Sequence, residues 1–216
     1  MSVLYVTGTN TGVGKTTLAA LLLEEARRRG RRVGAMKPFC SGGRDDAVRL
    51  HALQTGGLTL DEVNPFHFEE PLTPLLAARR AGKSVTREQT LAAINSIRRD
   101  QIPLLIEGAG GLLSPLGEGF SLLDMIKAVP GKVCIVGGNV LGVLNLARLT
   151  SEALPIPQAD QAIVLMNPEK SDESTPHNAG LLREIIPGCL VTEIPFLNDP
   201  RTRIRAVDEI FSWWID

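Results

Sequence analysis

The 216-residue sequence predicts an α/β protein built on a doubly wound, mostly parallel sheet flanked by helices. Short apolar runs end in glycine or polar loops, alternate with longer amphipathic segments, and show little polar alternation of their own. Strands of this kind are typical of a sheet that helices cover on both faces, and such a sheet is parallel with right-handed crossovers. Because a chain of this length can bury a sufficient core as one unit, we expect residues 1–216 to form a single domain.

The apolar runs mark the expected strands and the amphipathic segments mark the expected helices. Strands are expected near Val3–Thr7, Val33–Lys37, Leu104–Glu107, Val133–Gly137, Ala162–Met166 and Leu190–Ile194. Helices are expected near Lys15–Arg29, Asp45–Gln54, Leu72–Ala81, Arg87–Arg99, Leu141–Leu154, Asn178–Ile186 and Arg203–Trp214. The longest irregular stretches, Pro38–Arg44 and Asn167–His177, are candidate functional loops.

Composition argues against several classes of partner. The formal net charge is −1, with 22% charged and 44% apolar residues, so electrostatics give no case for a nucleic acid or a membrane surface. No apolar stretch of transmembrane length is free of charge or proline, and the N-terminus shows no signal-peptide pattern. The 3 cysteines lie far apart and are expected as reduced thiols of a cytoplasmic protein. The 3 histidines lack metal-ligand spacing.

The strongest motif is a glycine-rich loop between an expected strand and an expected helix. It runs Gly8-Thr9-Asn10-Thr11-Gly12-Val13-Gly14-Lys15-Thr16-Thr17. The glycines let backbone N–H groups curl around a phosphate, Lys15 can reach its β- and γ-oxygens, and the Thr16 hydroxyl can ligate Mg²⁺. The sequence therefore predicts a P-loop NTPase fold that binds ATP with Mg²⁺. The usual spacing would put the first glycine at Thr9, whereas the sequence has Gly8 one residue earlier.

Two further segments are expected at the same edge of the sheet. Glu107 ends an apolar strand, and the following Gly108-Ala109-Gly110 allows close approach of the backbone to phosphate. A P-loop needs such a carboxylate to orient Mg²⁺. Lys37 ends the second strand, where its cation can face phosphate or developing negative charge, and Ser41 lies in a small loop suited to contacting a substrate.

Two smaller features leave alternatives open. Asp45 or Asp46 could cap the following helix or bind Mg²⁺, and taken alone Asp45 suits the N-cap position better. The segment Leu141-Gly142-Val143-Leu144-Asn145, taken alone, is an ordinary strand-to-helix turn. Its backbone N–H groups would also suit a carboxylate, because they lie where a helix starts.

Together these segments resemble the dethiobiotin synthetase family, ATP-dependent carboxylase-cyclases of biotin synthesis. The resemblance runs in order through Val6–Thr16, Lys37-Pro38, Ser41-Gly42, Asp46, Asn64-Pro65, Glu70-Pro71 with Pro74, Glu107–Gly111, Leu141-Gly142 with Asn145, Asn167 and Glu193-Ile194-Pro195. It implies that ATP, CO₂ and 7,8-diaminononanoate give dethiobiotin, ADP and phosphate. An amine would capture CO₂ as a carbamate, the γ-phosphate would activate it as a carbamic-phosphoric anhydride, and the second amine would close the ureido ring.

The resemblance also implies roles for individual residues. The catalytic residues would be Lys37, Lys15 and Thr11, and the Mg²⁺ ligands Thr16, Asp46 and Glu107. The other nucleotide contacts would come from Asn10, Gly12, Val13, Gly14, Thr17, Gly108, Ala109, Gly110, Asn167, Pro195, Phe196 and Leu197. Ser41 would contact the diamine or its carbamate.

The family's quaternary structure adds a further expectation. Family members are homodimers, which implies that the substrate's carboxylate tail meets the partner subunit near Leu141, Gly142 and Asn145. Leu75 and Leu146 stand at positions where the family often has histidine.

Two other functions are compatible with a P-loop. Another ATP-dependent amidation enzyme, such as the synthetase domain of cobyrinate amidotransferases, usually carries a glutaminase domain, for which this chain has neither the length nor a nucleophilic cysteine arrangement. A nucleotide-switch ATPase of the partitioning or positioning type often carries an extra lysine near the position of Asn10. The lack of that lysine, with Lys37 and Ser41 present, favours the enzyme.

Overall fold

The computed structural model describes residues 2–98, 102–196 and 200–215. Its centre is a six-stranded sheet in the order β2-β5-β1-β6-β7-β8, and all of the described neighbouring strands pair in parallel. The strands are β1 (Val3–Gly8), β2 (Gly34–Met36), β5 (Leu104–Gly111), β6 (Lys132–Gly138), β7 (Gln161–Met166) and β8 (Leu190–Ile194).

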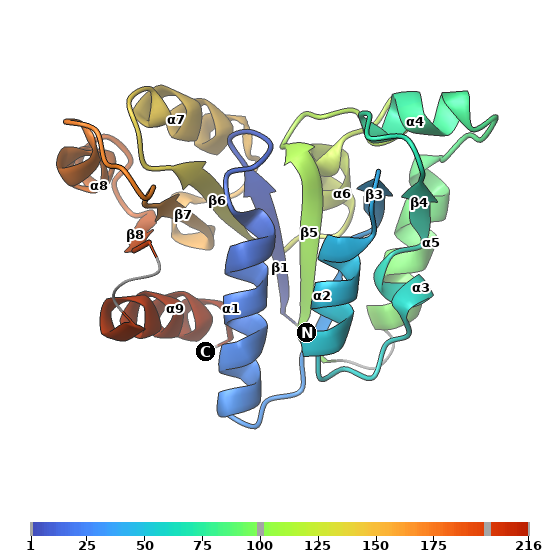
Figure 1. Ribbon diagram of the computed structural model, residues 1–216, viewed down its shortest axis with the longest axis horizontal. Coiled ribbons are helices and arrows are strands. Elements are labelled where there is room, and N and C mark those ends of the chain that lie inside the picture. The colour runs from blue at the N-terminus through green and yellow to red at the C-terminus, as the bar shows by residue number, and fades with distance from the viewer. Residues whose placement is uncertain (1, 99–101, 197–199, 216) are drawn as a thin grey trace.

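Helices cover both faces of this sheet (Figure 1). One face carries α1 (Lys15–Arg28), α2 (Asp45–Leu53) and α9 (Pro200–Ile215). The other carries α5 (Arg87–Arg98), α6 (Leu122–Ala128), α7 (Val143–Ala153) and α8 (Thr175–Ile185). The helices change face because the chain runs outward from β1 to β2 and then back across the sheet to β8, and parallel strands are connected by crossovers of one hand, the right hand.

Apolar side chains from the sheet and both helical layers form one core. Leu4, Val6, Leu105 and Ile135 are fully buried, as the unalternating apolar strands require. Burying one such side chain stabilises the fold by about 1.5–3 kcal/mol. The core therefore fixes the strand ends, and the carboxyl ends of the strands meet at the edge where the loop between β1 and α1 lies (Figure 1).

The predicted fold class is confirmed, and each predicted strand and helix is present with ends shifted by a few residues. The predicted helix end at Arg99 lies outside the described residues. The expectation that Pro38–Arg44 is irregular is wrong, because β3 (Phe39–Ser41) pairs in parallel with β4 (Phe66–Phe68) in a separate small sheet. The second expected loop, Asn167–His177, is shorter than predicted because α8 already begins at Thr175.

Several short elements were not predicted. They are α3 (Leu60–Val63), β4, α6 and the 3₁₀ turn Gln158–Asp160. One predicted helix is shorter than expected, since α4 covers only Pro74–Arg80. None of the helices within the described ranges is long and apolar enough to cross a membrane.

Candidate active site

The glycine-rich loop joins β1 to α1 at the carboxyl edge of the sheet. Gly12 and Gly14 have φ angles of 72° and 99°, a left-handed conformation that glycine adopts without strain. Gly14 is the N-cap of α1 and no side chain caps this helix, so the N–H groups of its first turn stay available to an anion. The Lys15 Nζ donates to the carbonyl oxygen of Asn10 at 3.1 Å, which holds the lysine across the loop. The loop is therefore preorganised to bind phosphate.

Gly8 explains the unusual glycine spacing. A Cβ at Gly8 would lie 2.6 Å from the carbonyl oxygen of Asn10 and 3.0 Å from the Lys15 Nζ. The N–H of Thr9 donates to the carbonyl oxygen of Val136 at 2.8 Å, which continues the pairing of β1 with β6 by one residue. The crowded position that requires glycine is therefore Gly8, and a side chain is accommodated at Thr9.

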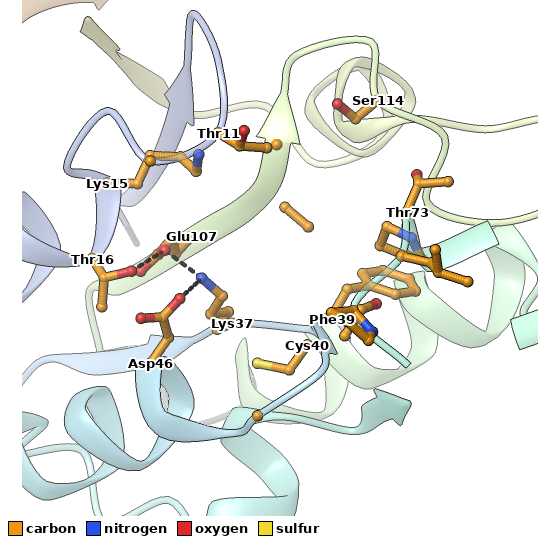
Figure 2. A pocket seen from close by; sticks show the side chains of 18 of the residues that line it. Thr11, Lys15, Thr16, Lys37, Phe39, Cys40, Asp46, Thr73, Glu107 and Ser114 are labelled. Atoms are coloured by element: carbon orange, nitrogen blue, oxygen red, sulfur yellow. Dashed lines mark hydrogen bonds and ion pairs between the residues drawn. The ribbon is translucent and has the colours of Figure 1, made fainter. Parts of the chain in front are cut away.

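A connected cluster of charged and hydroxyl groups lies beside the loop (Figure 2). The Lys37 Nζ lies 2.6 Å from Asp46 Oδ2 and 2.6 Å from Glu107 Oε1. The Thr16 hydroxyl donates to the same Glu107 oxygen at 2.7 Å. Four residues that the sequence singled out, on α1, β5, α2 and the loop after β2, are thus brought together in space.

Strand register explains the pairing of Lys37 with Glu107. Met36 is the last residue of β2 and lies opposite Ile106 of β5, so the next residues along the two parallel strands are neighbours. The expectation that Glu107 ends its strand is wrong, because β5 continues to Gly111 alongside β1. β2 is the strand that ends here, which leaves room for the Lys37 side chain next to Glu107.

The cluster is strongly coupled electrostatically. Burial alone would lower the pKa of Lys37, but the charge of Glu107 and the hydrogen bonds to Asp46 and Glu107 outweigh burial and raise it. Burial would raise the pKa of Asp46, but its hydrogen bond and charge interaction with Lys37 lower it instead. Burial is the largest effect on Lys15 and lowers its pKa, with Glu107 opposing the shift. Lys37 is therefore a fixed cation at neutral pH.

The donor set suits a hard divalent cation. Glu107 is 0% exposed and its Oε2 has no hydrogen-bond partner among the described residues. An unpartnered buried carboxylate oxygen is costly unless something binds it. Asp46 and the Thr16 hydroxyl add further oxygen ligands nearby, and oxygen ligands are those that Mg²⁺ takes in proteins.

A cavity of about 640 Å³ opens from this cluster. Figure 2 shows Thr11 and Lys15 on one side of it, with Thr73 and Ser114 across the space. The Ser41 hydroxyl is buried and without a hydrogen-bond partner among the described residues, and Ser41 lines the cavity. The wall is therefore polar near the phosphate loop, and Ser41 adds to it a hydroxyl that no described residue hydrogen-bonds.

Several wall residues were missed by the sequence analysis. They are Phe39, Cys40, Arg49, Thr73 and Ser114. Thr73 and Ser114 could have been predicted as wall residues, because Thr73 precedes Pro74 and Ser114 closely follows the glycine run after Glu107. Burial raises the pKa of the Cys40 thiol to about 11, so this wall residue is not an activated nucleophile at neutral pH.

A second cavity of about 440 Å³ adjoins the other side of the loop. It brings together Asn167, Pro195 and Phe196, which the resemblance implies as nucleotide contacts, with Gly12 and Val13. Leu197 lies outside the described residues. The two cavities share Gly12, Gly14 and Thr17, so they meet at the glycine-rich loop and the start of α1.

Some singled-out residues lie away from these cavities. Gly108 packs against α6, where a Cβ would lie 2.6 Å from Leu122 Cδ2. The suggestion that Asp45 is the N-cap is wrong, because Arg44 is the N-cap of α2 and Asp45 is its first residue. Asp46, not Asp45, therefore faces Lys37. Asn10 contributes its carbonyl group to Lys15 and lines neither cavity.

The turn after β6 also lies outside both cavities of its own chain. Leu141 is 83% exposed, and Gly142 has a φ of 96° as the N-cap of α7. The N–H of Leu141 donates to Asp172 Oδ2 at 2.8 Å. Leu141, Gly142 and Asn145 line neither described cavity, so a ligand in the 640 Å³ cavity would meet such a turn only from another subunit.

Comparisons with known proteins agree with this geometry. The AAA domain family model AAA_26 matches residues 2–201. The ATP-dependent dethiobiotin synthetase BioD of Anaeromyxobacter dehalogenans (strain 2CP-C) is 34% identical over 216 residues, covering 97% of this chain and 96% of that protein. The protein of the same name from Marinobacter nauticus is 39% identical over 173 residues, covering 74% of this chain and 71% of its own.

Solved structures show the same fold at lower similarity. Hydrogenase maturation factor HypB from Archaeoglobus fulgidus superposes with a TM-score of 0.53 at 16% identity, covering 99% of this chain and 88% of its own. The signal recognition particle receptor FtsY from Elizabethkingia anophelis, in complex with GDP, superposes with a TM-score of 0.54 at 15% identity, covering 100% of this chain and 64% of its own. These likenesses concern the fold alone, whereas the curated relatives show that the chain belongs to the dethiobiotin synthetase family.

Proposed function

We propose that this protein is an ATP-dependent dethiobiotin synthetase, which uses ATP and Mg²⁺ in the cytoplasm to carboxylate 7,8-diaminononanoate with CO₂ and close the ureido ring. The observation that carries the proposal is the cluster of Lys37, Asp46, Glu107 and Thr16 at the junction of the phosphate loop and the 640 Å³ cavity. In a chain of this family, that cluster lies where an anionic carbamate has to meet a γ-phosphate.

The two lysines act on the main electrostatic obstacle, the repulsion between two anions. One amine nitrogen forms a bond to CO₂ and loses a proton, and a carbamate oxygen then attacks the γ-phosphorus as the bond to ADP breaks. Lys15 is held across the loop by Asn10, and Lys37 is held by two carboxylates. Preorganised cations of this kind stabilise developing charge without the cost of reorientation. Thr11 lines the cavity beside Lys15 and would contact the same oxygens.

Ring closure needs the second amine to reach the activated carbon. That amine attacks the carbamate carbon, the carbon–oxygen bond to phosphate breaks, and inorganic phosphate leaves with the ureido ring formed. The buried Ser41 hydroxyl supports a hydrogen bond to the diamine or carbamate, because it has no partner within the described part of the chain. Phe39 and Leu72 offer apolar surface to the methylene chain of the substrate.

The metal would be held by Thr16, Asp46 and Glu107, the oxygen donors beside the loop. Bound there, Mg²⁺ would neutralise charge on the β- and γ-phosphate oxygens. The nucleobase would lie in the 440 Å³ cavity with Asn167, Pro195 and Phe196. Selectivity for ATP would then depend on the groups that this cavity presents.

A homodimer completes the proposed site. The outer surface of α7 and α8, with the turn before α7, exposes Leu141, Leu146, Leu149, Leu181 and Ile185. Clustered exposed apolar side chains of this kind indicate a surface that another protein covers. A second copy bound there would bring its Leu141–Asn145 turn toward the open end of the 640 Å³ cavity, where the carboxylate tail of the substrate would lie.

The proposal is tested by phosphate release from ATP with and without 7,8-diaminononanoate and bicarbonate. We expect release to require both compounds. Hydrolysis that is indifferent to the diamine would contradict the proposal and would point to the nucleotide-switch function instead.

A further inference from the structure

One cation of the 640 Å³ cavity takes no part in the cluster around Lys37. Arg49 lies on α2, lines this cavity and is exposed. Its guanidinium forms no hydrogen bond or ion pair with any residue in the described ranges, although Asp46 stands on the same helix. The Asp46 carboxylate is already paired with Lys37 at 2.6 Å. Arg49 therefore presents a planar set of N–H donors to whatever occupies the cavity.

A second arginine beside the same helix has a different role. Arg44 is the N-cap residue of α2, and its guanidinium donates to side-chain oxygens of Asn64 and Asp61, both at 3.0 Å. It lines neither described cavity. The fold therefore uses the hydrogen bonds of Arg44, whereas those of Arg49 are left for a ligand.

The position of Arg49 on α2 relates it to the phosphate end of the site. Side chains three residues apart on a helix are neighbours, with about 5–6 Å between their Cβ atoms, so Arg49 flanks Asp46 on the side of α2 that lines the cavity. α2 packs along α1, whose first residues include Thr16 and Thr17 of the same cavity wall (Figure 1). Arg49 thus reaches the cavity beside the proposed Mg²⁺ ligands, and it does not line the 440 Å³ cavity.

The charges of the cavity wall show what Arg49 would add. The described lining residues include the cations Lys15, Lys37 and Arg49 and the carboxylates Asp46 and Glu107. The two carboxylates already pair with Lys37, and the 440 Å³ cavity has no charged residue among its described lining. A triphosphate brings more negative charge than Lys15 and one Mg²⁺ offset, and a carbamate brings more. A further cation beside the phosphates therefore stabilises the bound nucleotide.

We propose that Arg49 donates hydrogen bonds to the γ-phosphate of ATP, so that the protein distinguishes ATP from ADP through this residue. The inference rests on the proposed placement of the triphosphate at the glycine-rich loop. There the β-phosphate would lie among the N–H groups of the loop, and the γ-phosphate would extend into the 640 Å³ cavity, whose wall includes Lys37 and Arg49. A guanidinium pairs with phosphate oxygens through two parallel N–H donors, and it stabilises the charge that is redistributed when the γ-phosphoryl group is transferred.

The test compares the binding of MgATP and MgADP to wild-type and Arg49→Gln protein, measured by calorimetry at low ionic strength without the diamine. We expect the dissociation constant for MgATP to rise about tenfold in the variant, the size of one charge-assisted hydrogen bond at an exposed position. The constant for MgADP should change by less than about twofold, because ADP lacks the γ-phosphate. The melting temperature of the variant without nucleotide should equal that of the wild type, since the Arg49 guanidinium bonds to no described residue.

Arg44→Gln is the matched control, because it removes one positive charge beside the same helix. It should lower the melting temperature through the loss of the hydrogen bonds to Asn64 and Asp61, and it should leave both dissociation constants unchanged. Equal weakening of MgATP and MgADP in Arg49→Gln, no weakening of either, or equal weakening of MgATP in the two variants would each overturn the inference. Because the diamine is absent, these results leave the synthetase proposal standing, and phosphate release that ignored the diamine would not alter the comparison of ATP with ADP.

Discussion

The two ends of the proposed ATP site, the phosphate end at the glycine-rich loop and the nucleobase end in the 440 Å³ cavity, are organised by different interactions. At the phosphate end, Lys37 is held at 2.6 Å by both Asp46 and Glu107, beside a loop whose glycines adopt left-handed φ angles. At the nucleobase end, neutral amides such as Asn139 and Asn167 are held in one orientation by short hydrogen bonds. Full charges act on a charged ligand at a distance, whereas amides discriminate only when their donors and acceptors match it. Changes at the first end should therefore alter rate and metal dependence, and changes at the second end should alter selectivity.

The largest expected effect is that of Lys37→Ala. We expect turnover by the folded variant to fall about 10³-fold, because the variant lacks a preorganised cation at the developing charge. The change also leaves Glu107 buried without its cation, so stability has to be measured alongside turnover. The measurement is steady-state phosphate release together with a thermal melt.

Glu25→Gln is the matched control for Lys37→Ala. Glu25 is buried and pairs with Arg28 and Arg29 at 2.6 Å near the far end of α1, well away from the cavities. Its loss should lower the melting temperature and leave turnover unchanged. Equal turnover by Lys37→Ala and wild-type protein would show that Lys37 takes no part in the reaction.

Glu107→Gln should shift the metal dependence. The variant keeps the shape of the side chain and removes its charge, while Lys37 still pairs with Asp46. We expect the Mg²⁺ concentration for half-maximal activity to rise at least about tenfold, because a charged metal ligand is replaced by a neutral one. The check is a magnesium titration of both proteins, and superimposable curves would exclude Glu107 as a ligand.

Leu149→Glu should separate the two subunits. Leu149 is 57% exposed on α7, within the apolar surface proposed as the dimer interface. A glutamate carboxylate buried at that interface should prevent dimerisation, so the variant should sediment as a monomer. Because the Leu141–Asn145 turn of the partner subunit would then be missing from the site, turnover at limiting diamine should fall about tenfold. Ile204→Glu, at a residue 56% exposed on α9, is the control and should stay dimeric. Wild-type protein that sediments as a monomer would contradict the interface.

The smallest expected effect concerns Asp172 and acid. Hydrogen bonds from Ser174 and from the N–H of Leu141 lower the pKa of Asp172 from 3.8 to about 2. Because the folded-state pKa lies below the unfolded one, the stabilisation is fully present above about pH 4 and is lost as the pH falls toward 2. The melting temperature of Asp172→Asn should therefore lie a few degrees below wild type at pH 6, and the gap should close toward pH 2. A gap that is constant down to pH 2 would show that the carboxylate charge is not responsible.

Local patterns predicted the sheet well, and they predicted that the glycine-rich loop, Lys37 and Glu107 would lie at one edge of it. Strands such as β1 and β6 are largely apolar, and glycines followed by lysine and threonine at this spacing are typical of a phosphate-binding loop. Lys37 and Glu107 could be paired in advance because parallel strands bring their carboxyl ends to one edge. That their side chains are in contact follows only from the structure, where the Lys37 Nζ lies 2.6 Å from Glu107 Oε1.

Features that depend on tertiary contacts could not be predicted in this way. β3 and β4 have three residues each, too short for a period to show, and they are held partly by stacking of Phe39 on Phe66 at 5.0 Å between ring centroids. Which of Asp45 and Asp46 lies beside Lys37, and so could bind Mg²⁺, depends on the direction of α2 relative to Lys37. The hydrogen bonds of Asn139 with Asn167 and Glu193 could not be predicted either, since one asparagine at a strand end carries no pattern.

In the proposed reaction, ATP cleavage by this protein drives the capture of CO₂ by a diamine. The most direct test supplies ¹³C-bicarbonate, 7,8-diaminononanoate, ATP and Mg²⁺ to the protein and measures labelled cyclic urea and ADP by mass spectrometry. We expect labelled dethiobiotin and ADP in equal amounts, and neither product above background when the diamine is left out. ADP formed without the labelled ring would contradict the account.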